Sequence, residues 1–291
     1  MPKLPDRRST TERVECTLLV PAYNEAGGIR RCLGAIAASP LPPGAVWSEW
    51  VVLDDTSSDG TATEAEEWAR RHPELPLRVD RSAARRGKAV ALEAARQVLA
   101  ARAAEGLDVV MVVADADTRT TPGALAALIE PFVADASLGV AWGLSVPEGR
   151  LFAVRLSPLP SLAWRPDLIN EDRPLAEFVR RAGVSHRSVP DATTRVTPAR
   201  GRRDFYIQTY RLVATDAAVK AALGPAPAPH RDGSHRLATA LAVARVAARN
   251  PAALPAYLSA RVIAVLIHRL HPATFGDRWA VSESTKAVPP R

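Results

Sequence analysis

Residues 109–117 read Val109-Val-Met-Val-Val-Ala-Asp-Ala-Asp117, six apolar residues followed by two carboxylates that one alanine separates. A short apolar run that ends in polar residues is typical of a strand buried on both faces of a sheet. In an extended segment, residues i and i+2 point to the same side, so the side chains of Asp115 and Asp117 are expected together. Two such carboxylates suit a hard divalent cation, Mg²⁺ or Mn²⁺. The alternative is a solvated turn.

Strand and helix patterns alternate on both sides of this segment. Polar residues follow the strands, and Thr61-x-x-Glu64 and Thr121-Pro122 have the composition of helix starts. The pattern predicts strands at 16–20, 50–53, 77–79, 109–114 and 140–142, and helices at 29–38, 61–71, 87–104 and 123–133. This alternation indicates an α/β fold, in which a mostly parallel sheet is flanked by helices on both faces.

The rhythm changes after Gly143. The pattern predicts a strand at 151–155, a helix at 173–181, a Pro- and Arg-rich loop at 189–203, a helix at 204–222, a linker at 224–229, and helices at 234–249 and 255–270. The last two helices would form a C-terminal helical extension.

Composition excludes several classes of protein. The chain has 291 residues, of which 47% are hydrophobic, which is enough to bury a core. Its two cysteines, Cys16 and Cys32, make no disulfide framework, which favours a reducing compartment. Neither an apolar run of about 20 residues nor a secretory signal pattern is visible, so a cytoplasmic protein is expected.

Positive charge is concentrated toward the C-terminus. Residues 195–291 contain 15 Lys/Arg and 5 Asp/Glu, whereas the first 194 residues are slightly acidic. Such an excess suits an anionic neighbour, but few aromatic residues accompany it, so nucleic acid is not expected. The segment 255–270 has an edge of Arg261, His268 and Arg269 beside apolar residues. It could lie on a membrane surface as a peripheral contact, or pack on a partner or on the core.

Four motifs resemble the signatures of glycosyltransferase family two, whose members have the GT-A fold. They are Leu18-Leu-Val-Pro-Ala-Tyr-Asn-Glu25, Leu53-Asp-Asp-Thr-Ser-Ser-Asp-Gly-Thr61, Gly87-Lys88 and Ala114-Asp-Ala-Asp117, in this order. The clear match runs from about residue 14 to 143, and a looser one to about residue 211. No Gly-rich dinucleotide or P-loop motif is present.

The resemblance implies a site for a nucleotide-sugar donor with a UDP, GDP or dTDP carrier and a divalent metal, Mn²⁺ or Mg²⁺. Residues of the first three motifs would contact its base, ribose or diphosphate: Pro21, Tyr23, Glu25, Asp54, Asp55 and Lys88. Of the Asp pair, Asp55 is the preferred contact to the base. Asp115 would contact the ribose or the metal, and Asp117 the metal. Alternatives remain for Tyr23 as a core aromatic, for Lys88 as a solvated lysine and for Asp59 as a helix cap.

Two further motifs resemble the catalytic part of the family. Glu171-Asp172 matches the pair that supplies the catalytic base, here Asp172, although Asp172 could instead cap the helix before Pro174. Gln208 and Arg211 match an acceptor-binding and a diphosphate-binding residue, and they share a helix face at i and i+3. Leu212 stands where processive relatives have tryptophan, which puts processive synthesis in doubt.

The expected organisation follows from these matches. We expect a tail over 1–13, a donor-binding subdomain over 14–143, an acceptor and catalytic-base subdomain over 144–223, and a linker with a basic helical extension over 224–291. The expected activity is metal-dependent, inverting, non-processive glycosyl transfer to an acceptor hydroxyl, with the acceptor itself open. Because the segment after Gly143 is short, an inactive nucleotide-sugar-binding scaffold is the alternative.

Overall fold

The computed structural model describes residues 13–144, 151–157, 159, 172–195, 202–224 and 253–270, and the chain divides into two compact units. The first unit comprises Met1–Thr197 with Lys286–Arg291, and the second comprises Pro198–Thr285. The predicted linker 224–229, apart from Gly224, and the predicted helix 234–249 lie outside the described residues.

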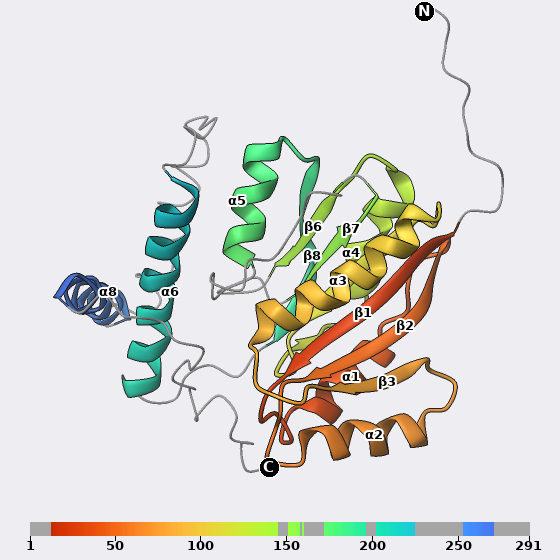
Figure 1. Ribbon diagram of the computed structural model, residues 1–291, viewed down its shortest axis with the longest axis horizontal. Coiled ribbons are helices and arrows are strands. Elements are labelled where there is room, and N and C mark those ends of the chain that lie inside the picture. The colour runs from red at the N-terminus through yellow and green to blue at the C-terminus, as the bar shows by residue number, and fades with distance from the viewer. Residues whose placement is uncertain are drawn as a thin grey trace, which may run out of the picture. The chain divides into compact units, whose positions relative to one another are not determined.

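The first unit is built on parallel strands. The strands β1 (Val14–Ala22), β2 (Ala45–Asp54), β3 (Leu77–Arg81) and β4 (Val109–Ala114) run in the order β3-β2-β1-β4 and all point the same way (Figure 1). All six residues of β4 are buried, as its apolar run predicts. The strand β1 does not stop at Pro21 but pairs through Ala22, because Pro21 still fits opposite Leu53.

Helices cover both faces of this sheet, which confirms the predicted α/β architecture (Figure 1). On one face lie α1 (Ile29–Ala37), α2 (Thr61–Arg71) and α4 (Ala124–Ala134), and on the other α3 (Lys88–Ala104) and α5 (Asp172–Ala182). Neighbouring residues of β1 point to opposite faces of the sheet: Leu18 packs with α1, α2 and α4, and Leu19 packs with α3 and α5. The strand alternation thus places one apolar side chain in each layer in turn.

The sheet continues beyond β4 with mixed directions. The strands β7 (Leu151–Arg155), β6 (Val140–Leu144), β8 (His186–Arg195) and β5 (Arg119–Thr120) follow β4 in this order. The strand β7 is antiparallel to β4 and β6, and β8 is parallel to β6. The pairing brings the end of β8 beside β5, directly after the Asp115–Asp117 segment.

The predicted loop over 189–203 is wrong in its first part, because β8 occupies residues up to Arg195. Proline usually argues against a strand because it cannot donate to a ladder. Here Gly143 pairs with Val189 while Leu144 pairs with Thr193, so Pro190 lies where the register shifts. The short strand β5 has no sequence signal of its own and exists only because β8 lies beside it.

Both predicted helix caps are also wrong, although the helices themselves are confirmed. The residue before α2 is Gly60 at φ 90°, and the residue before α4 is Gly123 at φ 80°; neither residue caps its helix with a side chain. Thr61 and Thr121 instead bond to other segments, Thr61 to the loop after β1 and Thr121 to the carbonyl of Thr193. These hydroxyl groups therefore form tertiary hydrogen bonds in place of helix caps.

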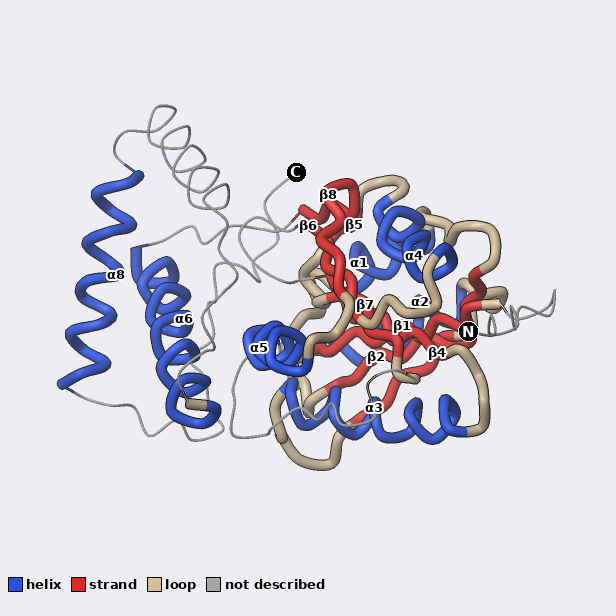
Figure 2. The backbone as a smooth tube through the Cα atoms, turned by 90° about the horizontal axis from the view of Figure 1, so that it is seen from above, coloured by secondary structure: helices blue, strands red, loops and turns tan. Residues whose placement is uncertain are grey.

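The second unit contains two described helices that pack side by side, α6 (Arg202–Leu223) and α8 (Ala253–Leu270) (Figure 2). The helix α6 matches the helix predicted at 204–222, and α8 matches the helix predicted at 255–270; each begins two residues earlier than predicted. Within the described part of the chain, no helix is long and apolar enough to cross a membrane.

Candidate functional site: the carboxyl edge of the parallel strands

The parallel strands bring the predicted donor-binding motifs to one edge of the sheet. Ala22 at the end of β1 pairs with Asp54 at the end of β2, and the amide of Asp55 donates to the carbonyl of Ala22 at 2.9 Å. Because β4 is parallel to β1, the Asp115–Asp117 segment follows at the same edge. Ligands of open α/β sheets bind in the crevice beyond this edge.

The loop after β1 packs against the Asp115–Asp117 segment. A Cβ atom on Gly28 would lie 3.2 Å from the carbonyl oxygen of Ala116, so this close approach favours glycine. The Cys32 thiol donates to the carbonyl oxygen of Asp115 at 3.4 Å. Burial raises the pKa of the Cys32 thiol, and the negative charges of Asp117, Asp115 and Glu25 raise it further. The protonated thiol thus connects α1, which follows the first motif, to the fourth motif.

Hydrogen bonds join the first motif to the second. The amide of Asn24 donates to the Ser57 hydroxyl at 2.9 Å, and the Asn24 side-chain oxygen accepts from the amide of Ser58 at 2.9 Å. The amide of Glu25 donates to the Thr61 hydroxyl at 2.7 Å. Asn24 and Thr56 hold positive φ angles of 53° and 62°, which is costly for the β-branched Thr56. Such strain is a common property of binding loops.

Asp59 joins these loops and also binds the first amide of α2, so the predicted helix-cap alternative holds beside the loop contact. Its carboxylate accepts from the amide of Ala26 at 3.0 Å and from the amide and the hydroxyl of Thr61. Partial burial by itself would raise the pKa of Asp59, but the hydrogen bonds from Thr61 and Ala26 outweigh it and lower the pKa. The ionised carboxylate is therefore the form that the loops hold.

The two carboxylates at the end of β2 have different surroundings. Both oxygens of the buried Asp55 accept backbone amides, from Arg86 at 2.8 Å and from Gly87 at 2.9 Å. Asp55 thereby fixes the third motif, and each oxygen keeps a second lone pair. Asp54 accepts from the amide of Ser57 at 3.2 Å, while its Oδ1 is buried without a hydrogen-bond partner among the described residues.

Lys88 connects the third motif to the fourth. Its ammonium group forms an ion pair with the carboxylate of Asp115, and about a quarter of each side chain is exposed. The prediction that the Asp115–Asp117 segment is extended is wrong, and its alternative, a turn, is what the structure shows. In this turn the amide of Thr118 donates to the carbonyl of Asp115 at 2.9 Å. No three His, Cys, Asp or Glu side chains in the described ranges form a metal cluster. Two carboxylates on one turn fit a cation that takes its other ligands from phosphate oxygens and water.

A family model with the description glycosyl transferase family 2 matches residues 17–180, more than half of the chain. The chain belongs to this family. The expected resemblance is thereby confirmed, and the protein is a glycosyltransferase. No curated protein sequence matches the chain.

Solved structures support the GT-A fold of this glycosyltransferase. A mannosyltransferase from Pyrobaculum calidifontis, in complex with GDP-Man and Mn²⁺, is 23% identical with a TM-score of 0.66, covering 90% of this chain and 88% of its own. The glucosyl-3-phosphoglycerate synthase from Mycobacterium tuberculosis, in complex with Mn²⁺, UDP and phosphoglyceric acid, is 19% identical with a TM-score of 0.53, covering 74% and 80%. At these identities the similarity is one of fold.

A contact that the sequence did not reveal involves Tyr23, one of the predicted donor-binding residues of the glycosyltransferase. The guanidinium carbon of Arg85 lies 3.8 Å from the centroid of the Tyr23 ring, a cation–π contact. Arg85 precedes the third motif by two residues, and no pattern in the sequence links it to Tyr23. Only the fold brings the two loops together.

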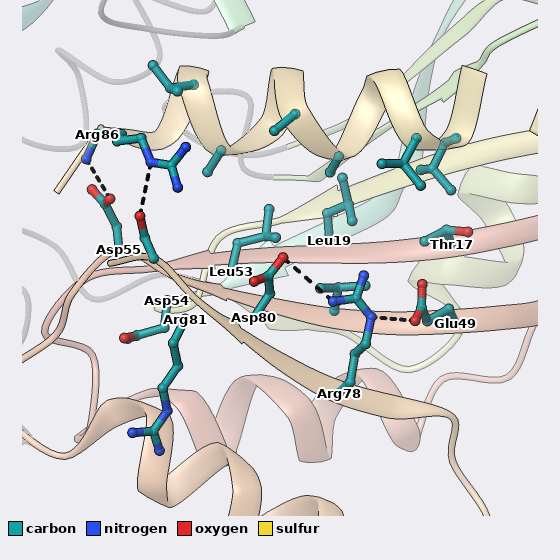
Figure 3. Close-up of a pocket in the computed structure, with 18 residues that line it drawn as sticks. Thr17, Leu19, Glu49, Leu53, Asp54, Asp55, Arg78, Asp80, Arg81 and Arg86 are labelled. Atoms are coloured by element: carbon teal, nitrogen blue, oxygen red, sulfur yellow. Dashed lines mark hydrogen bonds and ion pairs between the residues drawn. The ribbon is translucent and has the colours of Figure 1, made fainter. Parts of the chain in front are cut away.

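A narrow cavity begins at the Asp55 end of the site and runs under α3 toward Thr17 and Glu49 (Figure 3). Its volume is about 190 Å³. Ligand pockets usually measure roughly 300–1,000 Å³, so this cavity is too small for a nucleoside diphosphate. The open edge beyond the strands is therefore the better candidate for the donor site.

Among the residues predicted for catalysis and acceptor binding, those that the structure describes lie on helices after the donor-binding motifs. Asp172 is the first residue of α5, whereas Glu171 lies outside the described residues. The segment directly after α5 lies beside the start of β6, where the amide of Gly139 donates to the carbonyl of Ser185 at 2.9 Å. Since β6 starts at the amino edge, the beginning of α5 points toward the carboxyl edge (Figure 1). Gln208 and Arg211 lie on α6 in the second unit.

Proposed function

We propose that the protein is a metal-dependent, inverting, non-processive glycosyltransferase that transfers one sugar from a UDP-, GDP- or dTDP-sugar to an acceptor hydroxyl. The observation that carries this proposal is the connection of all four donor motifs at one sheet edge. Asn24 joins the first motif to the second, Asp55 joins the second to the third, and Lys88 joins the third to the fourth. Residues 14–143 would form the donor-binding subdomain.

The donor would lie along this edge with its base over Tyr23. Pro21 and Glu25 would frame the base and ribose, and Asp54 and Asp55 would accept hydrogen bonds from them. Lys88 would approach the diphosphate as a point charge, in exchange for part of its ion pair with Asp115. Asp115 and Asp117 would hold Mn²⁺ or Mg²⁺, which when bound neutralises charge on the diphosphate leaving group.

The acceptor side would supply the proton acceptor. The acceptor oxygen attacks the anomeric carbon, and the bond from that carbon to the diphosphate oxygen breaks with its electron pair. The proton of the acceptor hydroxyl passes to the carboxylate of Asp172, with Glu171 beside it. An aspartate is ionised at neutral pH by its ordinary pKa, so the carboxylate of Asp172 is available to accept the proton. Gln208 would bind the acceptor and Arg211 the diphosphate.

The proposal is tested by calorimetric titration of the purified protein with UDP, GDP and dTDP, each with Mn²⁺ and each with EDTA. We expect one nucleotide to bind at least tenfold more tightly with Mn²⁺, because a cation held by Asp115 and Asp117 would neutralise charge on the diphosphate. The Asp117→Asn variant should lose most of this metal effect. Glu130→Gln, which removes an exposed carboxylate on α4, serves as the control and should keep it.

The results separate the proposed enzyme from its alternatives. Failure of all three nucleotides to bind with Mn²⁺ would contradict the donor site. Tight binding without turnover of any nucleotide sugar would favour the scaffold function. Equal binding in Mn²⁺ and EDTA would contradict metal dependence.

We further propose that α8 contacts an anionic membrane surface. Five large apolar side chains of this helix are between 38% and 59% exposed: Leu258, Val262, Ile263, Leu266 and Ile267. The helix contains Arg261 and Arg269 and no Asp or Glu, and residues 195–291 are strongly basic. An exposed apolar row with basic neighbours suits the interface of anionic lipids.

Sedimentation with vesicles tests this contact. We expect wild-type protein to bind phosphatidylglycerol/phosphatidylcholine vesicles, and Val262→Ser/Leu266→Ser to bind at least tenfold more weakly. The control is Val98→Ser/Leu107→Ser, which removes two exposed apolar side chains of the first unit. Equal vesicle binding by the two double variants would contradict the role of α8. A wild-type protein that forms dimers through α8 in solution and does not bind the vesicles would contradict it too.

A further inference from the structure

The Arg85–Tyr23 contact lies where the proposed function needs free space. A base that stacks on Tyr23 requires a face of the ring, and the Arg85 guanidinium covers one face at 3.8 Å. Both residues are half-buried, so the contact belongs to the wall of the candidate site and does not lie fully in solvent. The ring and the guanidinium come from loops that follow different strands, β1 and β3.

Hydrogen bonds hold the backbone on both sides of Arg85, whereas the cation–π contact with Tyr23 holds its guanidinium. The Ser82 hydroxyl donates to the carbonyl of Ala84 at 2.6 Å, and Asp55 accepts the amides of Arg86 and Gly87. No carboxylate among the described residues forms an ion pair with Arg85, in contrast to Lys88. Among the described contacts, turning the guanidinium away from Tyr23 breaks the cation–π contact and leaves the hydrogen bonds of the loop in place.

We propose that Arg85 is a donor-binding residue with two positions. Without donor its guanidinium covers Tyr23; with donor the base takes its place on the ring, and the guanidinium turns to the diphosphate. This inference rests on the proposed function. A planar guanidinium matches both partners, because it stacks on aromatic faces and binds phosphate oxygens with paired N–H groups. Arg85 thus competes with the base but assists the diphosphate.

These opposite effects on one ligand can be separated by titrating a nucleoside and its diphosphate. The ligands are the nucleotide that binds wild-type protein, with Mn²⁺, and the nucleoside of the same base. In Arg85→Ala we expect the diphosphate to bind 10- to 100-fold more weakly, because a charged contact is lost. The nucleoside should bind equally well or several-fold more tightly, because nothing competes with it for Tyr23.

Two further variants complete the experiment. Arg85→Lys keeps the charge but not the planar group, so it should recover part of the diphosphate affinity. Arg70→Ala removes an exposed arginine of α2 with the same change in net charge, and should leave both affinities unchanged.

Three outcomes would contradict the role of Arg85. An equal loss of affinity for nucleoside and diphosphate in Arg85→Ala would mean that the arginine only supports the base. No change for either ligand would mean that Arg85 has no part in donor binding. A loss in Arg70→Ala as large as in Arg85→Ala would mean that general charge is responsible. Absence of any nucleotide binding by wild-type protein would instead overturn the proposed function itself.

Discussion

Replacing Asp172 with asparagine should lower kcat of glycosyl transfer by about 10²- to 10⁴-fold, the usual contribution of a general base. Affinity for the donor nucleotide should stay within about threefold, because Asp172 faces the acceptor in the proposed reaction. Transfer is measured with the nucleotide sugar that titration identifies, and binding by calorimetry.

Asparagine also separates the two interpretations of Asp172. Asn and Asp are about equally good at a helix N-terminus, so Asp172→Asn keeps a cap of α5 while it removes the base. Asp172→Ala removes both and should in addition lower the free energy of unfolding by about 1 kcal/mol.

A matched control lies on the same helix. Glu177→Gln removes a carboxylate that pairs with Arg180 and Arg181, and should leave kcat nearly unchanged. If Asp172→Asn retains full transfer, Asp172 is a cap and Glu171→Gln becomes the variant that must lose activity.

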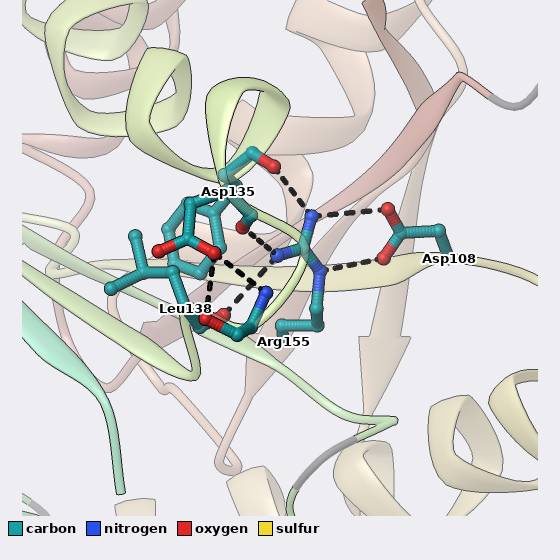
Figure 4. A network of polar contacts seen from close by, with 6 residues as sticks. Asp108, Asp135, Leu138 and Arg155 are labelled. Carbon is teal, nitrogen blue, oxygen red and sulfur yellow. Dashed lines mark hydrogen bonds and ion pairs between the residues drawn. The ribbon is translucent and has the colours of Figure 1, made fainter. Parts of the chain in front are cut away.

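Replacing Arg155 with methionine should lower the free energy of unfolding by about 3–5 kcal/mol, the cost of breaking a buried ion pair. Arg155 is 1% exposed and makes five hydrogen bonds (Figure 4). Two go to the carboxylate of Asp108, at 2.7 and 3.0 Å. Three go to the carbonyls of Phe132, Asp135 and Leu138, at the end of α4 and just beyond it. Methionine fills much of the volume but removes all five donated bonds, while the Asp135 carbonyl keeps the bond from the amide of Leu138.

The effect is measured by urea unfolding followed by tryptophan fluorescence. Arg102→Met is the control, because its ion pair with Glu15 is about one-third exposed and should contribute at most about 1 kcal/mol. A loss of stability no larger for Arg155→Met than for Arg102→Met would contradict the structural role of the buried arginine.

Much of the fold could be predicted because it depends on local periodicity. The apolar run 109–114 and the alternation of strand and helix patterns determine a parallel sheet with two covered faces, and β4 has the predicted bounds. The location of the donor motifs follows from the same pattern, because parallel strands all end at one edge. Leu18 and Leu19 pack into opposite layers for the same reason.

Features that depend on contacts between distant segments could not be predicted. Pro190 and its neighbours lack a strand pattern, and they pair only because β6 lies beside them. Thr61 matches a capping box, yet its hydroxyl bonds the amide of Glu25, 36 residues earlier. A hydroxyl or a carboxylate goes to whichever donor or acceptor the fold brings nearest.

The sequence by itself determined the α/β architecture, the family and the edge of the sheet at which the donor motifs gather. Only the tertiary structure decided how those motifs are held: Asp59 between two loops, Asp55 on the amides before α3, and Arg85 over Tyr23. The physical reason is that apolar periodicity reports which face of each element is buried. Which polar group meets which depends on the distances between loops, and these exist only in the folded chain.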